Sequence, residues 1–174
     1  MDYSNYEHLE IKVLDGVALI TMNRPESLNS ANFQLHYELS KIWLDIGNDD
    51  SVKVAVITGS GNAFSAGGDF EMIEAAIGNP AVIAQNTKEA GDIVYNLMNL
   101  DKPVISAING VAVGAGLAVA LLADISIASE KARITDGHTR LGVAAGDHAD
   151  MIWPLLCGMA RAKYYLMTGD ILDG

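Results

Sequence analysis

The sequence predicts an α/β fold, in which strands and helices alternate along the chain. The β-branched runs V-A-V-I-T at 54–58 and P-V-I-S-A-I at 103–108 have the composition of buried strands. Each run is closely followed by a glycine-rich turn, and the second turn opens directly into a helix-forming stretch. This repetition is typical of ββα or βαβ units.

The first part of the chain predicts a hairpin and then a helix. Apolar and polar residues alternate over 9–15, and D-G leads into a second run at 17–23, which indicates an antiparallel hairpin. A loop over 23–30 precedes a helix over 31–46. Its apolar residues recur in a helical rhythm at Phe33, Leu35, Leu39, Ile42 and Ile46.

The later elements alternate in the same way. We expect a strand at 54–58, a short helix at 71–76, a break at Asn79 and Pro80, a long helix at 82–100, a strand at 103–108, a helix at 115–122, a strand at 123–129 and a helix near 161–167. The long helix has an apolar face formed by Ile93, Val94, Leu97 and Met98. The chain then stops at T-G-D-I-L-D-G without a capping element, so we expect an interrupted fold.

Composition restricts the class of protein. A chain of 174 residues with 50% hydrophobic residues and a mean hydropathy of +0.21 fits one globular domain over 1–174. No apolar run is long enough to span a bilayer, and the acidic N-terminus is no secretory signal. The single Cys157 fits a reducing cytoplasm.

The charge of the chain and the spacing of its histidines and cysteine argue against nucleic acid and metal as partners. The net charge is −11 and no basic run interrupts the acidic background, which argues against a nucleic-acid partner. The four histidines and the one cysteine show no ligand spacing, so we expect no metal.

Two glycine-rich turns indicate the chemistry. F-S-A-G-G-D at 64–69 and N-G-V-A-V-G-A-G at 109–116 each follow a predicted strand, and the second lies at a helix N-terminus. Backbone N–H groups there lack intrahelical acceptors and favour negative charge. Two such turns can direct N–H groups at one point, as in an oxyanion hole. The alternative is that these glycines only allow tight turns.

These motifs resemble the crotonase superfamily, which includes enoyl-CoA hydratases and isomerases. The resemblance runs in order through the segments 22–30, 64–69, 102–110, 114–125 and 160–170. It implies a ββα spiral that assembles as a trimer or a dimer of trimers, and a C-terminal helical region that this chain lacks. It also implies acyl-CoA as substrate, with coenzyme A as part of that substrate and no covalently bound cofactor.

The resemblance assigns roles to particular residues. The N–H groups of Gly68 and Ala115 would form the oxyanion hole. The substrate, including its CoA portion, would lie beside Ala66, Gly67, Asp69 and Arg24.

The sequence departs from the family at both positions where hydratases carry a catalytic glutamate. Ala118 stands at the first position and His138 at the second. Because alanine can neither accept a proton nor position water, ordinary two-glutamate hydration is not available.

His138 and Asp147, nine residues apart, are the candidate acid/base pair. The spacing is similar to that in the β-diketone hydrolases of the superfamily, the oxo-camphor hydrolase type, although the further histidine of that branch is missing. Two alternatives stay open. His138 can be a loop residue bonded to Asp136 or to the backbone, and Asp147 can cap the helix that follows it.

Three functions remain possible from the sequence. The first is an enoyl-CoA hydratase/isomerase-family enzyme that forms an enolate of an acyl-CoA thioester and uses His138 and Asp147 as acid and base. The second is a CoA-independent C–C hydrolase of a cyclic β-diketone. The third is a catalytically silent binding protein with the same fold.

Overall fold

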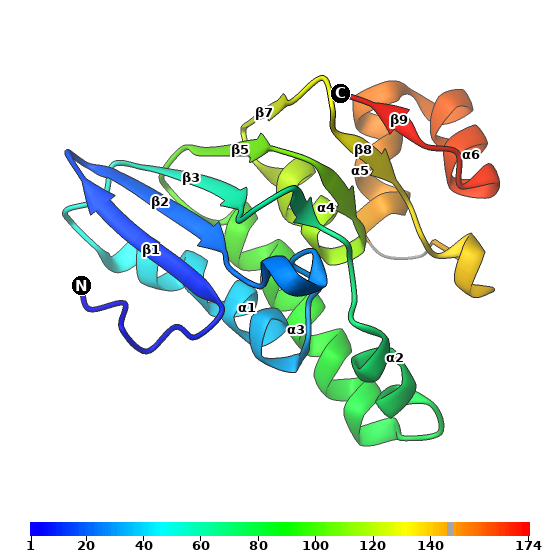
Figure 1. Ribbon diagram of the computed structural model, residues 1–174, viewed down its shortest axis with the longest axis horizontal. Coiled ribbons are helices and arrows are strands. Elements are labelled where there is room, and N and C mark those ends of the chain that lie inside the picture. The colour runs from blue at the N-terminus through cyan, green and yellow to red at the C-terminus, as the bar shows by residue number, and fades with distance from the viewer. Residues whose placement is uncertain (146–147) are drawn as a thin grey trace.

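A computed structural model describes residues 1–145 and 148–174, and it consists of two β-sheets and the helices packed on them (Figure 1). The strands are β1 (Leu9–Leu14), β2 (Val17–Met22), β3 (Val54–Gly59), β4 (Ala63–Ser65), β5 (Val104–Ile108), β6 (Val111–Val113), β7 (Ile125–Ala128), β8 (Arg133–Thr135) and β9 (Leu172–Asp173). The helices are α1 (Phe33–Asn48), α2 (Phe70–Ala76), α3 (Pro80–Met98), α4 (Gly114–Leu122), α5 (His148–Cys157) and α6 (Met159–Thr168), with short 3-10 turns at Pro25–Ser27 and Thr139–Leu141. The predicted α/β class is confirmed.

The larger sheet has the strand order β1-β2-β3-β5-β7. β1 and β2 form the predicted antiparallel hairpin. Asp15 and Gly16 between them have φ angles of 52° and 84°, as a two-residue type I′ turn requires. β2, β3, β5 and β7 run parallel, so the hairpin extends a parallel sheet at one edge.

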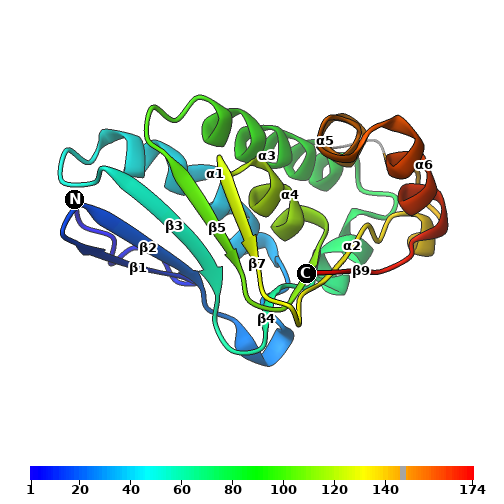
Figure 2. The same cartoon turned by 90° about the horizontal axis from the view of Figure 1, so that it is seen from above.

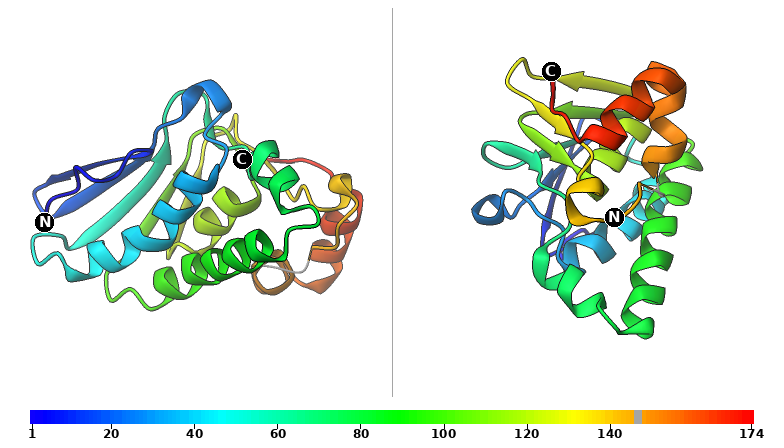
Figure 3. Two further views of the ribbon diagram at one scale, coloured as in Figure 1. Left: turned by 90° about the horizontal axis from the view of Figure 1, so that it is seen from below. Right: turned by 90° about the vertical axis from the view of Figure 1, so that its right-hand side faces the viewer.

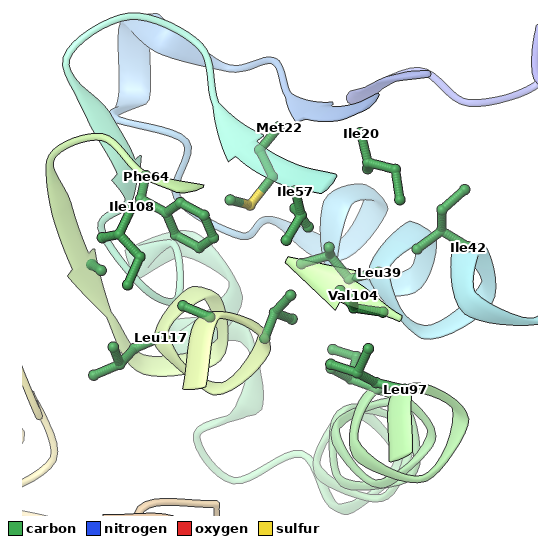
Figure 4. Close-up of a cluster of buried hydrophobic side chains, with 14 of the residues drawn as sticks. Ile20, Met22, Leu39, Ile42, Ile57, Phe64, Leu97, Val104, Ile108 and Leu117 are labelled. Atoms are coloured by element: carbon green, nitrogen blue, oxygen red, sulfur yellow. The ribbon is translucent and has the colours of Figure 1, made fainter. Parts of the chain in front are cut away.

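Helices α1, α3 and α4 lie on one face of this sheet (Figure 2). Alternate residues of β2 and β3 are buried on that face, as expected for strands with one covered side. In Figure 4, Leu39 and Ile42 of α1 lie with Ile57 of β3 in the buried cluster. Burial of these apolar side chains provides the main favourable free energy of folding.

Helix boundaries agree with the local signals in the sequence. The Asn32 side chain accepts a hydrogen bond from the Leu35 N–H and caps α1. Asn79 caps α3, which begins at Pro80, so the predicted break is confirmed. The chain after α3 contacts the far end of α1, where the Lys102 ammonium donates to the carbonyls of Ile46 and Asp49.

Two residues assigned to apolar helix faces are instead exposed. Phe33 is 44% exposed and Met98 is 59% exposed, whereas Ile93 and Leu97 are buried as predicted. Phe33 is the first residue of α1 and Met98 the last of α3. No further turn of the helix shields either side chain.

Three short strands of the smaller sheet do not stand out in the sequence. β4, β6 and β8 follow β3, β5 and β7 after brief turns and run parallel to one another, and β9 pairs antiparallel with β8. Each strand pair is followed by a helix, which gives the repeated ββα unit. Three residues are too few to display the alternation that identifies a strand.

Glycines lie at the corners between consecutive strands of the two sheets. A Cβ atom on Gly59 would lie 2.1 Å from the Ala63 carbonyl oxygen, and one on Gly110 would lie 2.0 Å from the Asn62 oxygen. The Asn109 amide bonds the Gly59 N–H and carbonyl across this corner, at 3.2 and 2.9 Å. These contacts fix where β4 and β6 leave the larger sheet.

The helices α5 and α6 pack on each other at the end of the molecule opposite the hairpin (Figure 3). They correspond to the helix predicted after position 147 and the helix predicted near 161–167. Among residues 1–145 and 148–174, no helix has the length and apolarity needed to cross a membrane.

Candidate active site

Three parallel strands of the smaller sheet end side by side, and each is followed by a segment singled out in the sequence. β4 pairs with β6 through Ser65 and Ala112, and β6 pairs with β8 through Val113 and Thr135. The chain therefore leaves one edge of the sheet at 66–69, 114–116 and 136–138. Ligand sites in α/β proteins form at such carboxyl ends of strands.

The first turn directs the Gly68 N–H away from its neighbouring chain. Ala31 accepts from the Asp69 N–H at 2.9 Å and donates to the Gly67 carbonyl at 2.7 Å. Because groups alternate in direction along an extended chain, the N–H of Gly68 points to the opposite side. Gly67 has a φ of 93°, a conformation that L side chains rarely adopt, so glycine is required there.

The second turn places Ala115 in the first turn of α4. N–H groups in that position have no intrahelical acceptor, and the N-cap residue Val113 provides no side-chain bond. A Cβ atom on Gly114 would lie 3.7 Å from the Gly68 nitrogen and 3.3 Å from the Gly67 Cα. The two glycine turns are therefore in direct contact.

Ser65 and Gly116 hold α4 against β4 behind these turns. A Cβ atom on Gly116 would lie 2.2 Å from the Ser65 Cβ, so only glycine allows this approach. The Ser65 hydroxyl donates to the Asn29 carbonyl at 2.8 Å and accepts from the Gly67 N–H at 3.4 Å. The distance between the two turns thus depends on the buried Ser65, whose hydroxyl is fixed by one donated and one accepted hydrogen bond.

Asp69 joins the first turn to the loop before α1. Its carboxylate contacts Arg24 at 3.3 Å and Ser30 at 3.2 Å, and it caps α2 through the Glu71 N–H. Burial acts to raise the pKa of Asp69, but these hydrogen bonds outweigh it and hold the pKa below its ordinary value. Arg24 also donates to the Ser30 carbonyl and is largely buried, so its guanidinium braces this loop.

The third strand end carries His138. Its Nδ1 lies 2.7 Å from Oδ1 of Asp136, whose side chain is buried. A Cβ atom on Gly137 would lie 3.4 Å from Cγ1 of Val113. A Cβ atom on Gly67 would lie 3.5 Å from the same Cγ1 atom. The histidine loop therefore meets both glycine turns around Val113. The bond to Asp136 was an alternative interpretation of the sequence, and Asp147 lies outside the described residues.

Ala118 lies on α4, one turn beyond Ala115, and is buried. The resemblance places a glutamate at this position, but the methyl group of alanine can neither accept a proton nor form a hydrogen bond.

Two other histidines, His36 and His148, are buried. His36 is buried, and its Nδ1 lies 2.8 Å from Oε2 of Glu89, which joins α1 to α3. Since α3 covers His36, this histidine has a structural role in joining the two helices. His148 is the first residue of α5 and is also buried. Within the described ranges, no cluster of His, Cys, Asp and Glu has the makings of a metal site.

The fold is the crotonase fold. A crystallised enoyl-CoA hydratase/isomerase from Mycobacterium paratuberculosis superposes with a TM-score of 0.94 and 35% identity, covering 99% of this chain and 69% of that one. The model of the enoyl-CoA hydratase/isomerase family matches residues 12–174. This chain belongs to that family.

Its relatives include enzymes of different reaction types. The chain is 35% identical over 160 residues to the 1,2-epoxyphenylacetyl-CoA isomerase of Escherichia coli, covering 91% of this chain and 61% of the relative. It is 31% identical over 176 residues to 4-chlorobenzoyl coenzyme A dehalogenase-2 of Arthrobacter, covering 99% of this chain and 63% of the relative. This chain thus spans about three fifths of the length of these relatives.

Proposed function

We propose that this protein binds an acyl-CoA thioester and stabilises the negative charge that develops on the thioester oxygen. The observation that supports this most is the contact between the two glycine turns, with the Gly68 N–H directed away from Ala31 and Ala115 in the first turn of α4. Two backbone donors near one point stabilise an enolate or tetrahedral oxyanion. Gly68 and Ala115 are the donors in this proposal.

Coenzyme A is proposed as the carrier of the acyl group. The names of the isomerase and the dehalogenase describe different reactions, but both name a CoA thioester. We place the thioester portion beside Ala66, Gly67 and Asp69. Arg24 supports this region through its contact with Asp69.

His138 and Asp147 are proposed as the acid/base residues. The carboxyl end of β8 brings Gly137, the residue before His138, against Val113 of the second glycine turn, and an imidazole exchanges protons readily near neutral pH. Abstraction of an α-proton breaks the C–H bond, forms an N–H bond on imidazole and moves the electron pair to the thioester oxygen. Gly68 and Ala115 would stabilise that oxygen.

A second candidate is C–C hydrolysis of a cyclic β-diketone without CoA. The observation that favours it is a histidine bonded to a carboxylate, in the loop that contacts the glycine turns at Val113, together with alanine at position 118. In this reaction, the histidine would activate water, and the departing enolate would occupy the same oxyanion hole.

Two measurements separate these candidates. Calorimetry compares the binding of acetoacetyl-CoA and coenzyme A with that of a bicyclic β-diketone. NMR then follows exchange of the α-protons of butyryl-CoA in D₂O. The proposal predicts CoA-dependent binding and enzyme-dependent exchange. Binding and cleavage of the diketone alone would establish the second candidate, and binding without any reaction would indicate a catalytically silent protein.

A further inference from the structure

We propose that Asp136 is the positioning residue that fixes the proton on Nδ1 of His138 and so leaves Nε2 as the base. This inference rests on the proposed role of His138 as the acid/base residue. Asp136 itself need not touch the substrate.

Both oxygens of the Asp136 carboxylate bond the same residue. Oδ1 lies 2.7 Å from Nδ1 of His138, and Oδ2 accepts the His138 main-chain N–H at 3.2 Å. The Asp136 side chain is 1% exposed, whereas that of His138 is 24% exposed. The carboxylate is thus buried behind an imidazole that remains accessible.

This geometry defines the tautomer of the neutral ring. An ionised carboxylate only accepts hydrogen bonds, so Nδ1 must carry the proton and Nε2 must carry the lone pair. When Nε2 takes a proton, the buried carboxylate stabilises the imidazolium that forms. The same pairing therefore orients the base and supports its charged form.

The main chain around the pair is held from several directions. The His138 carbonyl accepts from the N–H groups of Leu141 and Val143, each at 3.0 Å. On the other side, the Thr135 hydroxyl donates to the Gly169 carbonyl at 3.1 Å. Because the backbone is fixed at both ends, ring rotation is the freedom that the bond to Asp136 removes.

Asp136→Asn provides a sharp test, because an amide has one acceptor oxygen in place of two. The main-chain N–H of His138 can only donate, so in the variant it stays bonded to the side-chain oxygen of Asn at position 136. The amide NH₂ must then face Nδ1, which has to give up its proton. We expect the ring proton to move to Nε2, and α-proton exchange in butyryl-CoA to fall by about a hundredfold or more.

Long-range ¹H–¹⁵N NMR correlations report the tautomer directly, and His138→Gln assigns the signals. The wild-type ring should carry its proton on Nδ1, and the Asp136→Asn ring on Nε2. In the His138→Gln background, Asp136→Asn should have no further effect on exchange. The matched control is Asp173→Asn on β9, which removes an exposed ion pair with Arg133 of β8 and should change neither signal nor rate.

The outcomes separate this inference from the proposed function. A wild-type ring protonated on Nε2, or an Asp136→Asn variant with unchanged tautomer and exchange, would overturn the role of Asp136. If the variant does not fold, the wild-type spectrum still tests the inference, because a ring protonated on Nε2 would overturn it. A wild-type ring with the expected tautomer but no exchange in butyryl-CoA would support the inference and contradict the proposed enolate chemistry.

Discussion

At Gly68, a single backbone N–H group carries half of the proposed oxyanion hole. Gly68→Pro removes that donor, and we expect the rate of α-proton exchange to fall by about a hundredfold or more. Gly68→Ala is the matched control, because its Cβ would lie 3.6 Å from Ile73, an ordinary contact, and its N–H is retained. Equal losses in the two variants would show that the position matters for packing and not for its donor.

At position 118, we propose that alanine stands where hydratases of the family carry a catalytic glutamate. We expect hydration of crotonyl-CoA to be very slow or undetectable, because alanine at position 118 cannot position the attacking water and position 138 carries a histidine in place of a glutamate. The loss of absorbance of the conjugated thioester measures this reaction. Exchange in butyryl-CoA by the same preparation controls for active protein, and rapid hydration would contradict the argument.

At the residue scale, the sequence predicted the glycine turns and left Asp136 and Asp147 open as carboxylate partners of His138. Gly67 and Gly114 both have positive φ angles, which favour glycine. A backbone requirement of this kind is visible in the sequence as a glycine. The choice between two carboxylates depends on side-chain direction. Asp136 is two residues before His138 and Asp147 nine residues after it, and neither spacing reveals whether the carboxylate faces the ring.

At the element scale, the contact between α4 and β4 sets the separation of the two turns. Gly116→Ala adds a methyl group 2.2 Å from the Ser65 Cβ, and we expect a loss of stability of about 1–3 kcal/mol together with slower exchange. Thermal unfolding and the exchange assay measure the two effects.

A size exchange tests the same contact. Ser65→Gly combined with Gly116→Ala leaves the new methyl group 3.5 Å from the nearest backbone atom, the Cα at position 65, and should recover part of the exchange rate. Gly91→Ala on α3 is the control, because nothing lies within 4 Å of its Cβ position; it should stabilise by up to about 1 kcal/mol. No recovery in the double variant would show that the spacing is set elsewhere.

The elements differ in how clearly the sequence encodes them. The helices α1 and α3 and the strands β2, β3 and β5 are long enough to show periodicity, and their predicted positions are confirmed within a few residues. β4, β6 and β8 are three residues each and are defined by pairing between distant segments. Their carboxyl ends build the candidate site, so the geometry of the site required the structure.

At the scale of the whole molecule, acid stability depends on buried carboxylates such as Asp49. The Ser51 hydroxyl lowers the pKa of Asp49 most strongly; burial opposes this, but the Ser51 N–H and the Tyr3 hydroxyl reinforce the lowering. A lowered folded-state pKa contributes stability above the unfolded value near 4, and this contribution is lost as the pH falls through the folded-state pKa.

Asp49→Asn should therefore lower the melting temperature at pH 7 by about 5 °C and flatten the decline in stability below about pH 4. Thermal unfolding between pH 2 and pH 7, on the order of one pH unit per step, measures both effects. The exposed neighbour Asp50→Asn is the control and should match the wild type. If the stability of Asp49→Asn declines at acid pH as steeply as that of the wild type, other groups cause the acid sensitivity.

The most direct test of the central claim is a crystal structure of the protein with bound butyryl-CoA. We predict that the thioester oxygen lies about 3 Å from both the Gly68 and the Ala115 nitrogen, with the His138 imidazole facing the α-carbon. A thioester oxygen bound elsewhere, or contacting neither N–H group, would contradict the assignment of the two glycine turns as an oxyanion hole.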